Sequence, residues 1–198
     1  FLFSNAALRR AFTNSFLLAG AAALVSALAS FILGYLTTVR RNVLARLLDL
    51  LADAPYAVPG TVLALGVIMV FLPPLPVFEV SLYGTAWIIL VAYLARFMPL
   101  ALRPVAASYA TMDPALDEAG QILGARVPRR LVQLSLPSVL PATIAGALLV
   151  FMSAFNELTL SALLWSTGTE TLGVMVFFLQ YEGNSPAASA LATIVVAV

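Results

Sequence analysis

The chain has 198 residues, of which 62% are apolar and 10% are charged, and its mean hydropathy is +1.03. Because a soluble domain is about 45–50% apolar and about 25% charged, this composition excludes a soluble globule and indicates an all-α, polytopic protein in a lipid bilayer. The sequence has no Cys, His or Lys and a net charge of +1, which excludes catalytic thiolates, Ser/His/Asp triads, His-ligated metals, disulfides and a basic nucleic-acid surface.

The first uncharged run extends from Thr13 to Val39. Its 27 residues exceed the roughly 20 that cross a hydrocarbon core about 30 Å thick, so we expect one complete spanning helix. Arg40, Arg41 and Arg46 follow it. By the positive-inside rule, these charges place the loop from Arg40 to Asp53 in the cytoplasm.

Two further apolar runs follow. Ala54 to Phe78 has 25 uncharged residues and ends in the turn-rich segment Pro73 to Pro76, so we expect it to return the chain outward. Val80 to Leu102 is the third expected span, and Arg96 in its last third is expected to snorkel toward the interface. The chain then reaches Arg103, where a cytoplasmic arginine is again expected.

The most polar stretch is 103–130, which holds four Arg and three acidic residues and which we assign to a cytoplasmic loop. Leu131 to Asn156 then has 26 residues without a charge and is expected to run outward. Seven of the ten Arg fall on the assigned inner side, whereas Arg9 and Arg10 fall on the outer side. A preceding helix or an interfacial segment would explain why these two arginines fall on the outer side.

Residues 157–182 are less regular. Glu157, Glu170 and Glu182 divide them into apolar pieces of 12 and 11 residues, each too short to span a bilayer. A turn signal separates the pieces, so we expect a re-entrant or periplasm-side segment here.

The two ends of the chain indicate a piece of a longer protein. It starts with Phe1 rather than Met, and the segment from Ser185 to Val198 ends inside an apolar run. We therefore expect a single transmembrane domain over residues 1–198, with about five core transmembrane helices, the last of them truncated.

A short helix is predicted inside the polar loop. Asp113 can accept a hydrogen bond from the free N–H groups of a first helical turn, and Pro114 suits the first helical position. Gly124 provides a C-terminal stop about ten residues later. A helix roughly 15 Å long is too short to cross the bilayer, so it would lie outside the membrane and be free to contact a partner.

This loop resembles the cytoplasmic signature of bacterial ATP-binding-cassette (ABC) importer permeases. That pattern is Glu-Ala-Ala, three residues, Gly, nine residues, Ile, one residue and Leu-Pro, and the present spacing matches it at every fixed position. The departures are Gly120 for the second Ala and Leu134 for Ile. The matching residues and those beside them are Asp113, Asp117, Glu118, Ala119, Gly120, Gly124, Leu134, Leu136 and Pro137.

The resemblance implies a coupling loop over about residues 104–137 that docks on a cytoplasmic ABC ATPase dimer. Small residues at Ala119 and Gly120 would permit close approach, and Glu118 would offer a charge to a partner or to Arg126 and Arg129. The alternative is that any membrane loop of this kind needs a capped helix with small residues.

Other segments are most similar to permeases of iron(III) uptake systems, among them Arg96-Phe97-Met98-Pro99 and Phe155-Asn156-Glu157-Leu158. This resemblance implies the C-terminal half of a bacterial inner-membrane permease, with a second half or subunit, a periplasmic substrate-binding protein, and ATP and Mg on the partner ATPase. Permeases for thiamine, phosphonate, sulfate, molybdate or polyamines share much of the pattern. We expect no cofactor, catalytic residue or metal ligand in this chain.

Three polar residues are candidates for a translocation path. Glu157, beside Asn156, would face a path rather than lipid if it lay deep in the membrane, and Arg96 could act as a gate. Alternatively, Glu157 sits near the periplasmic end or bonds neighbouring helices, and Arg96 anchors a helix end. An ion-coupled secondary transporter using Glu157 or Arg96 is the remote alternative. A membrane aspartyl enzyme would need two carboxylates in the membrane, and only Glu157 qualifies.

Overall fold

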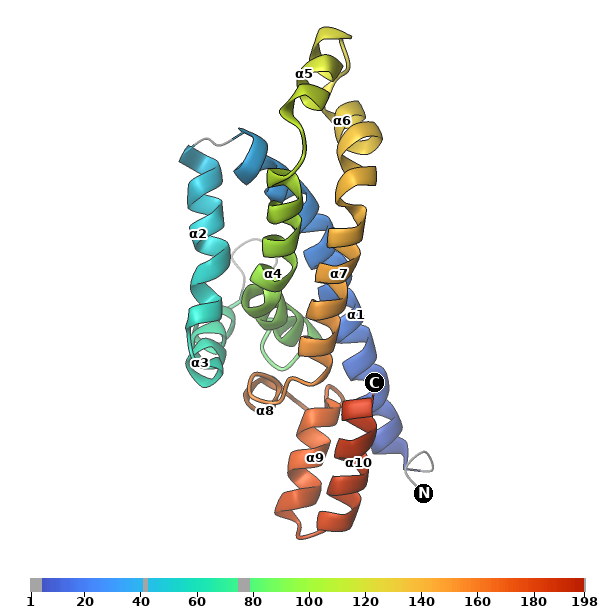
Figure 1. The fold of residues 1–198 in the computed structure, drawn as a ribbon. Helices are drawn as coiled ribbons and strands as arrows, with labels where there is room; N and C mark the ends of the chain where they lie inside the picture. The colour runs from blue at the N-terminus through green and yellow to red at the C-terminus, as the bar shows by residue number, and fades with distance from the viewer. Residues whose placement is uncertain (1–4, 41–42, 75–78, 198) are drawn as a thin grey trace. The chain divides into compact units, whose positions relative to one another are not determined.

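The computed structural model describes residues 5–40, 43–74 and 79–197 (Figure 1). Arg41 and the end of the Pro73 to Pro76 turn lie outside these residues, as do the side chains of Arg40 and Arg46. Among the described residues there are helices and no strand, which confirms the all-α prediction. The elements are α1 (Ala6–Tyr35), η1 (Leu36–Arg40), α2 (Val43–Ala57), α3 (Gly60–Phe71), α4 (Ala86–Ala110), α5 (Pro114–Ile122), α6 (Val127–Arg130), η2 (Leu131–Ser135), α7 (Leu136–Phe155), α8 (Ser161–Leu164), α9 (Leu172–Tyr181) and α10 (Ser185–Ala197).

By length and composition, three helical stretches in the described part of the chain could cross a membrane: Ala6–Val39, Ala86–Ala110 and Val127–Phe155. A fourth span results if α2 and α3 are counted together, and α9 and α10 are shorter apolar helices. The expected number of about five is therefore not confirmed. The prediction of a polytopic helical membrane protein is confirmed.

The first span begins earlier than its uncharged run. Helix α1 starts at Ala6, and Asn5 Oδ1 accepts a hydrogen bond from Ala7 N at 2.9 Å. An Asn side chain that satisfies a first-turn N–H is a strong helix start. Arg9 and Arg10 therefore lie exposed on the first turns of α1 itself.

The second expected span is broken into two helices, and the expected loop from Arg40 to Asp53 is partly helical. Helix α2 begins at Val43, and it ends at Ala57 before Pro59. Pro59 adopts φ −54° and ψ 138°, an extended conformation, and a proline also disfavours helix in the residue before it. A charge-free run does not reveal such a break.

The third span is shifted toward the C-terminus relative to Val80–Leu102. Gly84, two residues before α4 starts at Ala86, has φ +78°, a left-handed conformation that keeps it out of the helix. The helix then continues past Arg103 and Pro104 to Ala110. Prolines are tolerated inside membrane helices because neighbouring groups satisfy the freed backbone, so the expected start of a loop at Arg103 is wrong.

The fourth span starts slightly before its uncharged run. It comprises α6, the π-helical turn η2 and α7, and it extends over Val127–Phe155. Residues 157–182 form the expected irregular segment, in which only α8 and α9 are helical. Helices α9 and α10 then lie side by side (Figure 1).

Contacts within the chain group into two compact units. One contains Ala23–Ala54 and Met98–Val150. Its core joins side chains from α1, α4 and α7, namely Tyr35, Val105, Tyr109 and Val139. The Tyr35 and Tyr109 rings are 6.0 Å apart and edge-on, a favoured aromatic geometry.

The other unit contains Phe1–Ala22, Pro55–Phe97 and Phe151–Val198. Here α1 holds the irregular segment before α9. The Asn14 side chain donates to the carbonyls of Gly168 at 2.9 Å and Glu170 at 3.0 Å, and Ser15 Oγ accepts from Leu172 N at 2.8 Å. These bonds satisfy backbone groups that the short, irregular segment leaves unpaired.

Candidate functional site

The short helix of the polar loop forms where the sequence predicts it. Asp113 Oδ1 accepts a hydrogen bond from Ala115 N at 2.9 Å, and Pro114 is the first helical residue. Helix α5 ends at Ile122, and Gly124 follows with φ +74°. Only glycine adopts this conformation at little cost, so both predicted boundaries of the helix are confirmed.

Helix α5 has one inward face and a wide exposed face. Asp117 and Gly120 are its buried residues, and their spacing of three places them on the same side. Glu118 and Ala119 are exposed. Large apolar side chains are also exposed at both ends of α5, namely Leu116, Ile122 and Leu123.

The inward face of α5 meets a buried arginine. Arg130 Nη1 lies 3.3 Å from Asp117 Oδ2 and donates to the Asp117 carbonyl at 3.2 Å. Gln121 Nε2 donates to the same carboxylate oxygen at 3.0 Å. Arg130 is only 4% exposed and Asp117 only 8% exposed. In the described part of the loop, Glu118 forms no ion pair with an arginine.

The remaining residues of the loop pattern surround this contact. Leu134 is half-buried, and its Cδ1 lies 3.0 Å from the position that a Cβ on Gly120 would take. Leu136 starts α7 and is half-buried, whereas Pro137 is exposed. The fixed spacing between Gly120 and Leu134 therefore brings these two residues into contact.

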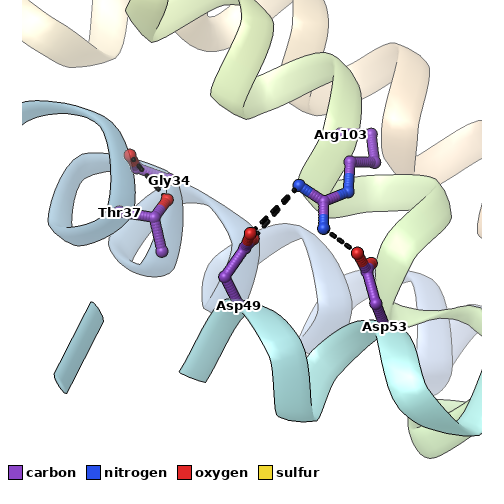
Figure 2. A network of polar contacts seen from close by, with 5 residues as sticks. All are labelled: Gly34, Thr37, Asp49, Asp53 and Arg103. Carbon is purple, nitrogen blue, oxygen red and sulfur yellow. Dashed lines mark hydrogen bonds and ion pairs between the residues drawn. The ribbon is translucent and has the colours of Figure 1, made fainter. Parts of the chain in front are cut away.

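Sequence reasoning missed an ion-pair cluster in the same unit. Arg103 Nη1 lies 3.1 Å from Asp49 Oδ1, and Arg103 Nη2 pairs with Asp53 Oδ2. Figure 2 shows the Arg103 guanidinium reaching both carboxylates of α2 from α4. The spacing of four between the two aspartates places them on one helix face, which is the signal that could have indicated a shared partner. Beside this cluster in Figure 2, Thr37 Oγ1 donates to the Gly34 carbonyl at 3.3 Å.

The candidate path residues lie in the other unit. Arg96 Nη1 donates to the Val58 carbonyl at 2.9 Å, where the break between α2 and α3 leaves that carbonyl available. Glu157 Oε2 accepts from Leu160 N at 2.8 Å and from Ser161 N at 3.3 Å. Asn156 is exposed, and its side chain donates to Met152 O at 2.9 Å.

Glu157 thus lies two residues beyond the span Val127–Phe155. Burial raises the pKa of its carboxyl above the ordinary value, and the bonds from Leu160 N and Ser161 N and the charge of Arg96 partly offset this. Its carboxylate thus accepts from the two backbone N–H groups at the start of the short helix α8. A role of Arg96, Asn156 and Glu157 in a path remains a prediction.

Among the residues that the structure describes, no three acidic side chains come together in a way that could hold a metal ion. The polar groups that do come together are arginine–carboxylate pairs and capped helix ends. Such groups position helices and present charge to a partner.

Comparison with known proteins identifies relatives. A family described as "Binding-protein-dependent transport system inner membrane component" matches residues 27–198. The Fe(3+)-transport system permease protein FbpB 2 of Haemophilus influenzae is 32% identical over 183 residues, which are 92% of this chain and 35% of that protein. The probable ABC transporter permease protein y4fN of Sinorhizobium fredii is 32% identical over 83% of this chain and 29% of that protein.

A third relative is the sulfate transport system permease protein CysT of Salmonella typhimurium, which is 32% identical over 76% of this chain and 58% of that protein. The chain therefore spans about a third of the length of the first two relatives, with 35% and 29% covered. It spans somewhat over half of the third, with 58% covered.

Solved structures share the fold. A bacterial ABC transporter involved in the import of the acidic polysaccharide alginate superposes with a TM-score of 0.75 at 16% identity, over 98% of this chain and 75% of that chain. The same transporter type in complex with an alginate pentasaccharide-bound periplasmic protein gives a TM-score of 0.71 at 17% identity, over 98% of this chain and 73% of that chain. At these identities the likeness shows the fold alone.

Proposed function

The chain belongs to the family of inner-membrane components of binding-protein-dependent transport systems, and from this premise we propose that it is a non-catalytic permease subunit of an ABC importer. In this role residues 1–198 form one transmembrane permease domain of a bacterial inner membrane. The domain supplies part of a translocation path and converts ATP hydrolysis by a partner into uptake. The three apolar helical spans and the family match support this role.

The observation that carries the proposal is the geometry of the loop over about residues 104–137. Its helix α5 is capped by Asp113, is ended by Gly124, and exposes Glu118 and Ala119. A folded helix with an exposed acidic and small-residue face suits docking into a groove of another subunit. That partner is proposed to be a cytoplasmic ABC ATPase dimer, which would hold the ATP and Mg.

The other proposed partners are a periplasmic substrate-binding protein and a second permease half or subunit. The fold neighbour solved in complex with a periplasmic protein supports the first of these by analogy. Arg96, Asn156 and Glu157 are proposed to lie along the path, because polar and ionisable side chains of membrane segments seldom face lipid.

The proposed substrate is iron(III). The support is the 32% identity to FbpB 2 over 92% of the chain. Relatives with sulfate and 2-aminoethylphosphonate in their names match over 76% and 73% of the chain, so these anions are the alternative substrates, with thiamine, molybdate and polyamines behind them. The proposed mechanism is the same for iron(III) and for each of these alternative substrates.

The test is uptake by the assembled transporter in lipid vesicles that contain ATP inside and the loaded binding protein outside. We expect accumulation of radioactive ferric iron that requires ATP and persists when an ionophore collapses ion gradients. Uptake that follows the ion gradient and ignores ATP would contradict the permease role. ATP-dependent uptake of sulfate or 2-aminoethylphosphonate in place of iron would contradict the substrate alone.

A further inference from the structure

Arg130 is an unusual residue to find buried at the base of a membrane helix. It is the last residue of α6, it lies directly before η2, and it is 4% exposed. A buried charge is stable only when it is paired and hydrogen-bonded. Its pairing is with α5: Nη1 contacts both Oδ2 and the carbonyl oxygen of Asp117, at 3.3 and 3.2 Å.

Gly120 makes this contact possible. A Cβ at Gly120 would lie 3.0 Å from Arg130 Cδ, 3.2 Å from Arg130 Cγ and 3.0 Å from Leu134 Cδ1. These distances are shorter than ordinary carbon–carbon contacts of about 3.5–4.0 Å. The stem of Arg130 therefore occupies the space that the second alanine of the Glu-Ala-Ala pattern would need. The glycine at position 120 therefore leaves the space that the buried side chain of Arg130 fills.

We propose that Arg130 is a positioning residue that locks α5 to the segment leading into α7 through Asp117, and that Gly120 is the companion residue that leaves room for it. This inference rests on the proposed coupling function, and it adds how a movement of α5 would be transmitted to α7. With the lock in place, α5 and the start of α7 move as one body. Without it, α5 would pivot about the Gly124 turn and its displacement would be lost.

The neighbouring residue provides a matched control. Arg129 precedes Arg130 on α6, is exposed, and donates through Nε to Gln133 Oε1 at 2.9 Å. Arg129→Met and Arg130→Met remove the same charge from adjacent positions. Only Arg130→Met leaves a buried carboxylate without its cationic partner, which is far more disruptive than loss of an exposed charge.

The test measures the distance between spin labels on α5 and α7 in the assembled transporter in lipid nanodiscs. The sequence has no cysteine, so cysteines introduced at the exposed positions Ala115 and Ser138 carry the labels, with the partners made cysteine-free. We expect a single narrow distance in the parent chain and in Arg129→Met. Arg130→Met should lose the narrow distance, and Asp117→Asn with Arg130→Met should lose it to the same extent, because removal of either partner already breaks the lock.

A second double-mutant cycle tests the role of Gly120. Gly120→Ala should broaden the distance distribution when Arg130 is present and should add less broadening when residue 130 is also changed by Arg130→Ala. A narrow distance in Arg130→Met, or equal broadening by Gly120→Ala in both backgrounds, would overturn the lock. Broadening with unchanged ATP-driven uptake would support the lock and contradict the coupling function.

Discussion

Three arginines on the membrane helices donate to acceptors inside the chain. Arg96 donates to the Val58 carbonyl, Arg103 pairs with two aspartates of α2, and Arg130 pairs with Asp117. An arginine at mid-bilayer costs about 2.5–3.5 kcal/mol on insertion scales, and internal acceptors reduce that cost. At the residue scale, these three arginines therefore fasten helix to helix or helix to loop.

The Arg103 cluster should contribute a small, measurable stability. Its side chain is 46% exposed, and those of Asp49 and Asp53 are 33% and 43% exposed, so each pair is expected to contribute only about 0.2–1 kcal/mol. Arg103→Gln should lower the unfolding free energy in detergent by that order. In the Asp49→Asn, Asp53→Asn background the same change should have no effect, and an equal effect in both backgrounds would exclude the pairing.

Glu157 should make stability depend on pH. Because burial raises the pKa of its carboxyl in the folded state, the folded protein binds this proton more tightly than the unfolded chain does. The corresponding stability is present at low pH and is lost as pH rises through the folded-state pKa. Thermal unfolding of Glu157→Gln in detergent should lack this loss. A variant whose unfolding temperature follows pH as steeply as the parent chain does would refute the assignment.

At the scale of elements, local chemistry determined what could be predicted. Helix α5 was predictable because its boundaries depend on Asp113, Pro114 and Gly124, which act within one turn. The start of α4 was not, because Gly84 at φ +78° interrupts an apolar run that looks continuous. The contact between Asp117 and Arg130 joins residues that are 13 positions apart, and no helical period relates them.

The cap of α5 provides a prediction at this scale. Asp113→Ala removes the acceptor for Ala115 N, so it should destabilise the first turn by about 1 kcal/mol. Hydrogen–deuterium exchange of the α5 amides in the assembled transporter should then rise by about fivefold. Asp113→Asn keeps the acceptor and is the control. Equal exchange in Asp113→Ala and Asp113→Asn would show that the side-chain cap does not hold the helix.

At the scale of the whole molecule, composition and loop spacing were enough to predict a helical membrane protein and its permease family. Charge-free runs located the spans approximately, but they did not reveal the break at Pro59 or the continuation of α4 to Ala110. These features depend on backbone conformation and on neighbouring helices. The substrate stays a proposal, because relatives whose names give iron, sulfate and 2-aminoethylphosphonate all match this chain.

The central claim is that α5 couples ATP hydrolysis to transport, and Glu118 on its exposed face tests it most directly. The measurement is substrate uptake and ATP hydrolysis by the same vesicles containing the assembled transporter, with Glu118→Arg compared with Glu182→Arg, an equal charge change at an exposed glutamate outside the loop. We predict that Glu118→Arg inserts normally but loses uptake and substrate-stimulated hydrolysis, while Glu182→Arg retains both. Full uptake and full substrate-stimulated hydrolysis in Glu118→Arg would contradict the account.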